Sequence, residues 1–180
     1  MRVQGARIAE AEVGASGTPG QPSSAGSSGG LWTPLGPLAI RANARGITGV
    51  ELFVEAGDST AVPNELIAAA QQQLGAYFED PLRGFSLPLE LGGTPFQREV
   101  WELLAKIPPG QTLTYGDAAR QLGTSPRAVG GACRANPCPV LVPCHRIVAV
   151  RGLGGYSGAR GGRWLEAKSW LLRHEGAHPG

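Results

Sequence analysis

The chain has 180 residues, a formal net charge of +2 and a hydrophobic fraction of 42%. This length fits one compact unit or two small ones, and the mild positive charge permits nucleic-acid binding without requiring it. No apolar run is long enough to span a membrane and no signal-peptide core is present, so we expect no membrane partner. Three cysteines fall within twelve positions, which argues against a disulfide framework and favours a reducing, cytoplasmic location.

The N-terminal part is predicted to be a tail followed by a small α/β domain. Residues 1–30 end in a stretch of glycine, serine, proline and alanine that cannot bury enough apolar surface to offset its ordering entropy, so we predict a disordered tail. Residues 38–53 alternate apolar and polar side chains on both sides of a turn, which is typical of a β-hairpin. Residues 63–78 carry apolar side chains at helical spacing. We therefore expect residues 31–86 to form an antiparallel sheet with one main helix.

The C-terminal part is predicted to be mostly helical. Thr94, Pro95 and Gln97 form the pattern of an N-cap, a first helical residue and a capping-box partner. A boundary near this point gives a second domain over residues 87–176, followed by a short tail at 177–180. The chain as a whole is therefore assigned to the α/β (α+β) class.

Two short helices are predicted in this second domain. The first runs from Thr114 to about Leu122, and the second runs from Arg127 to about Arg134, with a glycine-containing turn between them. This spacing is typical of a helix-turn-helix motif. The residues between the two arginines are all small and offer no bidentate donors or acceptors for reading bases in the major groove. The second helix is suited either to touching DNA with little sequence preference or to packing tightly against another helix.

The tetrapeptide Pro143-Cys144-His145-Arg146 is the strongest candidate for chemistry, and it follows a short apolar run. Cysteine is the most nucleophilic side chain at neutral pH. A neighbouring cation lowers the pKa of a thiol, so we expect His145 and Arg146 to activate Cys144. Taken alone, the tetrapeptide is equally compatible with a buried structural cysteine beside a surface histidine.

Several segments together resemble one family, the O6-alkylguanine-DNA alkyltransferases. They are the Cys144 tetrapeptide, Arg127–Ala132, Asn136-Pro137, Gly155–Gly158 and Trp170–Gly176. The resemblance is strong over residues 92–176 and weak over 31–84. It implies DNA repair by direct reversal, in which an alkyl group moves from O6 of guanine to the protein's own cysteine, which is not regenerated.

The resemblance also implies what the protein acts with. Its partner would be double-stranded DNA carrying O6-alkylguanine, bound with little sequence preference, while activity on O4-alkylthymine is left open. No cofactor and no metal are implied. We expect a monomer, and cooperative binding along DNA is left open.

The resemblance assigns catalytic roles to four residues. Cys144 accepts the alkyl group, and His145 takes the thiol proton through a bound water. Glu175 orients His145, in the manner of a nucleophile, base and orienting acid. Tyr115 is expected to protonate the guanine as it leaves. Arg146 is expected to pair with a carboxylate and to fix the turn.

An alkylated O6 lies inside the base stack, so the nucleotide must leave the duplex before a thiol can reach it. By resemblance, Arg127 fills the space that the base vacates, and Tyr115 crowds the backbone phosphate during rotation. Ala128 and Arg134 are expected to contact DNA from the same helix as Arg127.

The remaining implied roles concern the pocket. Asn136 is expected to hold the turn that leads to the cysteine. Tyr156 and Ser157, in a glycine-rich stretch, are expected to close one wall, with the Ser157 N–H facing O6. The main-chain carbonyls of Cys144 and Ile147 would accept from the guanine amino group.

The chain departs from the family pattern in some features, and three other functions are alternatives to alkyl transfer. Residues 159–164 contain an excess over the compact family pattern, and the N-terminal half lacks zinc ligands. A lesion-sensing relative would have a different residue in place of Cys144. A transcription regulator would need a recognition helix able to read sequence, and a Cys-His hydrolase would need an oxyanion-hole motif, which is not evident.

Overall fold

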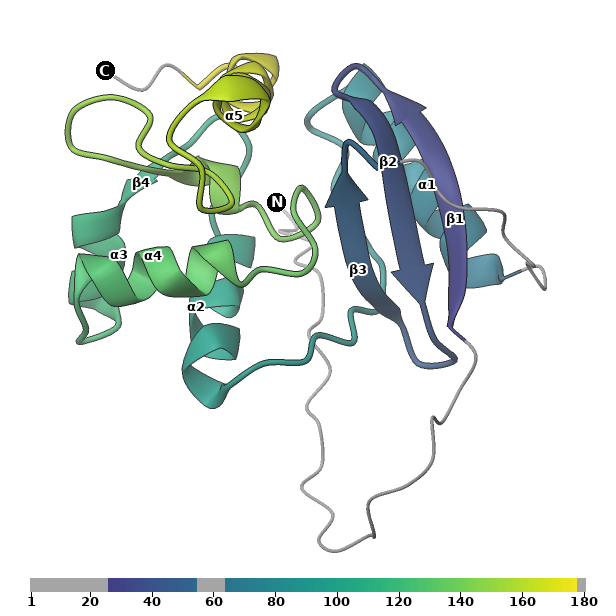
Figure 1. Ribbon diagram of the computed structural model, residues 1–180, viewed down its shortest axis with the longest axis horizontal. Helices are drawn as coiled ribbons and strands as arrows, with labels where there is room; N and C mark the ends of the chain where they lie inside the picture. The colour runs from purple at the N-terminus through teal and green to yellow at the C-terminus, as the bar shows by residue number, and fades with distance from the viewer. Residues whose placement is uncertain (1–25, 55–63, 178–180) are drawn as a thin grey trace, which may run out of the picture.

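The computed structural model describes residues 26–54 and 64–177 (Figure 1). The strands are β1 (Ser27–Thr33), β2 (Gly36–Ala42), β3 (Ile47–Leu52), β4 (Leu113–Thr114) and β5 (Ile147–Val148). The helices are α1 (Glu65–Glu79), α2 (Pro95–Ala105), α3 (Tyr115–Gln121), α4 (Pro126–Arg134), the 3-10 turn η1 (Cys144–Arg146) and α5 (Gly162–His174). The strand-rich N-terminal half and the helical C-terminal half share one continuous apolar core.

The N-terminal half is an antiparallel sheet in the order β1-β2-β3, with α1 packed against it (Figure 1). Leu38 and Ile40 on β2 are buried, and α1 presents Ile67, Ala70 and Leu74 from one face at the spacing of a helical stripe. The predicted hairpin and helix are therefore confirmed. Asn64, whose side chain accepts from the first free N–H groups of α1, fixes where the helix begins.

The predicted tail over residues 1–30 extends too far. Ser27 and Gly30 belong to β1, where they pair with Ala42 and Ala39 of β2. A strand ladder is built from backbone groups, so serine and glycine can join it without apolar side chains of their own. The rest of the predicted tail, residues 1–25, lies outside the described residues.

The C-terminal half begins with the predicted capping box. The Thr94 side chain accepts from the Gln97 N–H, and the Gln97 side chain accepts from the Thr94 N–H. The predicted tail at 177–180 begins one residue too early, since Ala177 is buried and donates its N–H to the Leu172 carbonyl at 2.8 Å. The last three residues, 178–180, are not described.

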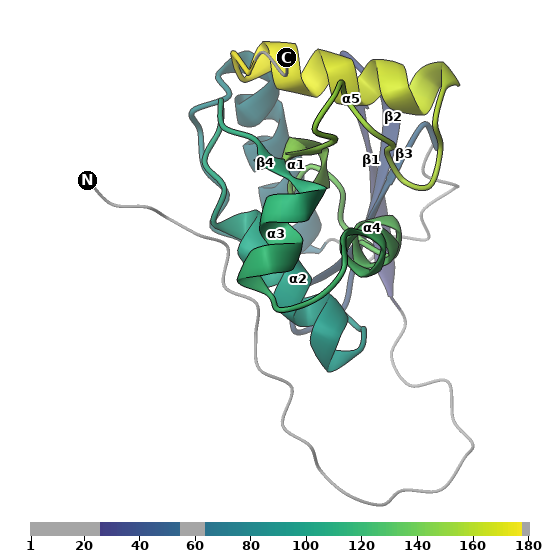
Figure 2. The same cartoon turned by 90° about the vertical axis from the view of Figure 1, so that its left-hand side faces the viewer.

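The pair α3 and α4 has the predicted helix-turn-helix arrangement. In Figure 2, α3 lies in the plane of the view, α4 is seen end-on, and α5 crosses above both. The short parallel pair of β4 and β5 joins the start of α3 to the segment that follows Cys144. This pairing brings Tyr115 and Cys144 to the same side of the domain. Over the described ranges, no helix has the length and apolar character needed to cross a membrane.

Candidate active site

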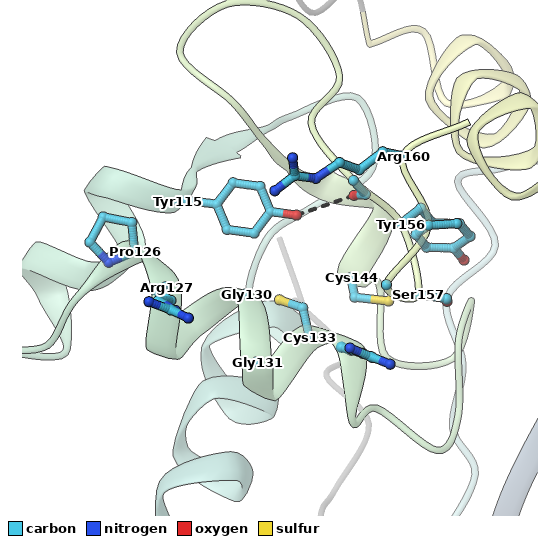
Figure 3. A pocket seen from close by; sticks show the side chains of 14 residues that line it. Tyr115, Pro126, Arg127, Gly130, Gly131, Cys133, Cys144, Tyr156, Ser157 and Arg160 are labelled. Atoms are coloured by element: carbon cyan, nitrogen blue, oxygen red, sulfur yellow. Dashed lines mark hydrogen bonds between the residues drawn. The ribbon is translucent and has the colours of Figure 1, made fainter.

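A pocket of about 750 Å³ opens between α4, η1 and the glycine-rich loop before α5. Cys144 and Cys133 both direct their sulfur atoms toward it, and the Tyr115 ring reaches it from the start of α3 (Figure 3). Six of the predicted site residues line it: Tyr115, Arg127, Arg134, Cys144, Tyr156 and Ser157. Ala128, the other predicted DNA contact, lies on α4 and is half-buried outside the lining.

The segment around Asn136 holds Cys144 in place. The Asn136 side-chain N–H group donates to the Val142 carbonyl at 2.9 Å and to the Cys144 Sγ at 3.2 Å. Its side-chain oxygen accepts from the Cys138 N–H at 3.0 Å. The same amide therefore closes the loop before the cysteine and donates a hydrogen bond to the sulfur itself.

The electrostatics of Cys144 differ from the sequence-based expectation. Burial raises the pKa of the thiol, and the Asn136 hydrogen bond and the charge of Lys168 lower it. The two neighbours do not lower the pKa of the thiol as cations, because burial lowers the pKa of His145 and keeps the ring neutral, and Arg146 is paired with Glu175. A neutral His145 can still act as a base. At neutral pH the thiol is protonated and needs a base.

His145 and Glu175 lie behind the cysteine, fully or nearly buried. The His145 Nε2 lies 2.9 Å from the Glu175 Oε1. Burial acts to raise the pKa of Glu175, but hydrogen bonds from His145 and Arg146 outweigh it and hold this pKa well below its usual range. An ionised carboxylate only accepts, so His145 carries its proton on Nε2 and leaves a lone pair on Nδ1. Nδ1 is buried and has no hydrogen-bond partner among the described residues.

Glu175 is shared by more groups than the sequence suggested. Arg146 was expected to pair with a carboxylate, and that carboxylate is Glu175. Arg146 donates from Nε to Oε2 at 2.9 Å and from Nη2 to Oε1 at 2.8 Å. Tyr77 of α1 donates its hydroxyl to Oε1 at 2.7 Å. Tyr77 was not predicted as a site residue, because nothing local in a helix of the other domain indicates this contact.

Lys168 is a second residue at the site that the sequence motifs do not indicate. It is fully buried on α5, and its Nζ donates to the Ile147 carbonyl at 2.5 Å and to the Gly155 carbonyl at 3.0 Å. Burial lowers its pKa to about 8. The Ile147 carbonyl, expected to accept from guanine, thus already accepts from Lys168 and has one lone pair left. The signal in the sequence was a lysine on the same helical stripe as Leu171 and Leu172.

Tyr115 and the glycine-rich loop form the opposite wall. The Tyr115 hydroxyl donates to the Gly155 carbonyl at 3.2 Å, and burial raises its pKa, so it keeps its proton. Tyr156 is buried, and burial together with the nearby Cys144 thiol raises the pKa of its hydroxyl well above the usual value. Ser157 adopts a positive φ of 48°, which turns the loop beside the pocket.

Cations surround the mouth of the pocket. Arg127 and Arg134 are exposed at the two ends of α4, and Arg160 of the loop also lines the pocket (Figure 3). The start of α4 is capped by Ser125, whose Oγ accepts from the Ala128 N–H. Exposed guanidinium groups around an apolar cavity suit a ligand that carries phosphates at its edge.

Comparisons with known proteins agree with this combination of fold and site. Residues 95–177 match the family model "6-O-methylguanine DNA methyltransferase, DNA binding domain". Residues 30–91 match "6-O-methylguanine DNA methyltransferase, ribonuclease-like domain". The two matches cover most of the chain and define a DNA alkyltransferase with an N-terminal ribonuclease-like domain.

Individual relatives extend over nearly the whole described chain. A methylated-DNA–protein-cysteine methyltransferase of Methanosarcina acetivorans is 37% identical over 153 residues, which is 81% of this chain and 95% of that protein. The constitutive enzyme of that name from Bacillus subtilis is 38% identical over 156 residues, which is 79% of this chain and 91% of the relative. The crystal structure of Mycobacterium tuberculosis OGT in complex with DNA has a TM-score of 0.69 and 34% identity, and the match covers 82% of this chain and 92% of that one.

The chain belongs to the O6-methylguanine-DNA methyltransferase family. The predicted family, the mixed α/β fold class and the predicted class of reaction, alkyl transfer from DNA to a protein cysteine in DNA repair, are confirmed. The protein is an enzyme whose macromolecular partner is DNA.

Proposed function

We propose that the chain repairs O6-alkylguanine in double-stranded DNA by moving the alkyl group onto Cys144, once per molecule. The observation that carries the proposal is the placement of the Cys144 sulfur. It lies at the pocket, accepts a hydrogen bond from Asn136, and has the His145–Glu175 pair behind it. A nucleophile, a base and an orienting carboxylate are thus assembled beside a cavity that opens to solvent.

The first step is extrusion of the damaged nucleotide. Flipping costs a few kcal/mol, and the cost is smaller for a base that pairs badly. Arg127, exposed in the first turn of α4, is placed to fill the gap in the stack while Tyr115 meets the rotated nucleotide. The small residues of α4 permit close approach to the duplex without reading its sequence.

The second step is transfer. His145 Nδ1 takes the Cys144 proton, the sulfur attacks the alkyl carbon, and a C–S bond forms as the bond from that carbon to O6 breaks. The electron pair of the broken bond passes into the guanine ring, which takes a proton from the Tyr115 hydroxyl. Tyr115 regains a proton from solvent at the open pocket, and His145 releases the thiol proton to solvent. The thiol loses one proton and the base gains one, so the reaction balances without a co-reactant. Regeneration would require the Cys144 thiolate to leave from the alkyl carbon of a stable thioether, so the protein acts once.

We further propose that the protein acts as a monomer in a reducing compartment such as the cytoplasm. The compartment is supported by Cys133, Cys138 and Cys144, which are free thiols, because an acceptor thiol must stay reduced to react.

A titration of repaired guanine against protein tests the proposal. Wild-type protein should restore at most one guanine per molecule in a duplex that contains O6-methylguanine. The variant Cys144→Ser should restore none while still binding the duplex. Cys133→Ser, which changes a thiol lining the same pocket, should behave like the wild type. Repair by Cys144→Ser, or many guanines restored per molecule, would overturn the proposal.

A further inference from the structure

The first turn of α5, which follows the glycine-rich loop, is in contact with the residue that ends β3. Phe53, at the end of β3, packs edge-on against Trp164 in the first turn of α5, with ring centroids 4.9 Å apart. The Arg163 guanidinium lies 4.5 Å from the centroid of the same Phe53 ring. Both partners of Phe53 come from the stretch at the start of α5, in or beside the segment where the chain exceeds the compact family pattern.

Trp164 continues this contact into the pocket wall. Its ring centroid lies 6.0 Å from that of Tyr156, again in an edge-to-face arrangement. Tyr156 is only 2% exposed and lines the pocket. Phe53, Trp164 and Tyr156 therefore form a continuous aromatic row from the end of a strand in one domain to the pocket in the other.

The loop needs such a contact because its many glycines leave its backbone with little preference for any one conformation. Six of the eleven residues from 152 to 162 are glycines. On the pocket side, the Gly155 carbonyl accepts from Tyr115 and Lys168, and Tyr156 and Ala159 exchange backbone hydrogen bonds of 2.9 Å. The aromatic row holds the loop from the opposite side.

Phe53 itself carries a sign of constraint. Its φ is +67°, a left-handed conformation that a bulky residue adopts only when its surroundings impose it. The Phe53 N–H donates to the Pro37 carbonyl at 2.7 Å, which fixes the backbone at this point. The left-handed turn ends β3 where the ring meets Trp164.

Strand β3 also contacts a second segment of the site, the loop before Cys144, through Val50. The Val50 N–H donates to the Pro137 carbonyl at 2.9 Å, in the loop that Asn136 closes onto Cys144. Figure 1 shows that β3 is the strand of the sheet nearest to the C-terminal half. Both walls beside the cysteine are therefore attached to one strand of the N-terminal domain.

We propose that Phe53 and Trp164, here called the clasp, are positioning residues that set the size of the O6-alkyl group the pocket accepts. Trp164 backs Tyr156, so the wall cannot retreat from a bulky group. Without this backing, Tyr156 can move outward, and a large group gains more room than a methyl group needs. This inference rests on the proposed function, because it concerns the substrate of the same pocket.

Single-turnover rates on two duplexes test the clasp, one with O6-methylguanine and one with O6-benzylguanine. Phe53→Ala and Trp164→Ala should each lower the methyl-to-benzyl rate ratio by about tenfold, the lower end of what pocket shape usually contributes to discrimination. Trp164→Phe, which keeps an aromatic ring behind Tyr156, should restore most of the wild-type ratio. Trp32→Ala is the matched control, since Trp32 is 74% exposed on β1.

Thermal unfolding of each variant separates a changed wall from a damaged fold. If Phe53→Ala or Trp164→Ala does not fold, Trp164→Phe and Phe53→Leu, which retain bulk, decide the test through the same ratio. An unchanged rate ratio in folded variants, or an equal loss of rate on both substrates, would overturn the proposed role of the clasp and leave the proposed function standing. Wild-type protein that transfers no methyl group would overturn the proposed function and the clasp with it.

Discussion

The pKa of the Cys144 thiol depends more on the groups that surround the sulfur in space than on its neighbours in sequence. Burial raises the pKa of the thiol, and the Asn136 donor and the charge of Lys168 act in the opposite direction. Burial also lowers the pKa of His145 below its ordinary 6.5, so the ring is neutral near physiological pH. The site thus keeps a protonated thiol beside an unprotonated base, with a buried cation placed to stabilise the thiolate as it forms.

This arrangement predicts how transfer depends on pH. The pKa of Lys168, lowered by burial to about 8, means that its charge is present below this pH and is lost above it. Burial lowers the pKa of His145, so the ring is unprotonated in the neutral range. Single-turnover rates should therefore be level from neutral pH to about pH 8 and fall above it.

The variant Lys168→Met provides the comparison for this profile. It should transfer more slowly at neutral pH and show no further fall above pH 8, because it has no charge to lose. A wild-type rate that rises steadily through this range would contradict the account. Such a rise would mean that ionisation of the Cys144 thiol, rather than the charge of Lys168, controls the rate.

Among the elements, α4 connects the pocket to DNA. It begins at a Ser125 cap with Pro126 in its first turn, and Trp101 of α2 donates to the Ala132 carbonyl at 2.9 Å, which fixes α4 against the domain. The exposed Arg127 is therefore carried by a rigid element, and its side chain is free to enter a duplex.

Replacement of Arg127 should separate flipping from chemistry. Arg127→Ala should slow repair of O6-methylguanine in a duplex by tenfold or more, by about the amount that base extrusion contributes. Its reaction with the free base O6-benzylguanine should stay within about twofold of the wild type, because no base has to leave a stack. Arg120→Ala, an exposed arginine on α3 that pairs with Asp117, is the control. Equal losses on both substrates would remove Arg127 from the flipping step.

The elements also show which features a sequence can predict. The Thr94 capping box, the helix-turn-helix and the β2-β3 hairpin depend on local patterns, and all three are present. Strand β1 was missed because its glycines and serines join the sheet through the backbone alone. The expected effect of neighbouring cations on the Cys144 pKa is absent, because a tetrapeptide does not reveal that His145 is buried and neutral or that Arg146 is paired with Glu175.

On the scale of the whole molecule, the two domains share the catalytic site. Tyr77 and Glu175 are 98 residues apart in the chain, yet they are joined by a buried hydrogen bond of 2.7 Å. No periodicity or motif connects positions so distant in sequence, which is why Tyr77 could not be predicted. Because Tyr77 lies on α1, the N-terminal domain helps to hold the carboxylate that orients His145.

Removal of this one hydroxyl tests the connection. Tyr77→Phe should lower the free energy of unfolding by about 2 kcal/mol, since a buried hydrogen bond to a charged group is lost. The transfer rate should fall by less than about tenfold, because Arg146 and His145 still hold Glu175. Urea unfolding and single-turnover rates measure the two effects. Unchanged stability would show that the Tyr77 bond does not join the domains energetically.

The role of Cys144 as the residue that receives the alkyl group from DNA can be tested directly. The most direct measurement is the intact mass of the protein after incubation with a duplex containing O6-methylguanine, followed by peptide mapping of the adduct. We expect a gain of one methyl group per molecule, on the peptide that contains Cys144 and not on Cys133. An unchanged mass with tight binding to the damaged duplex, or a methyl group on another residue, would contradict it.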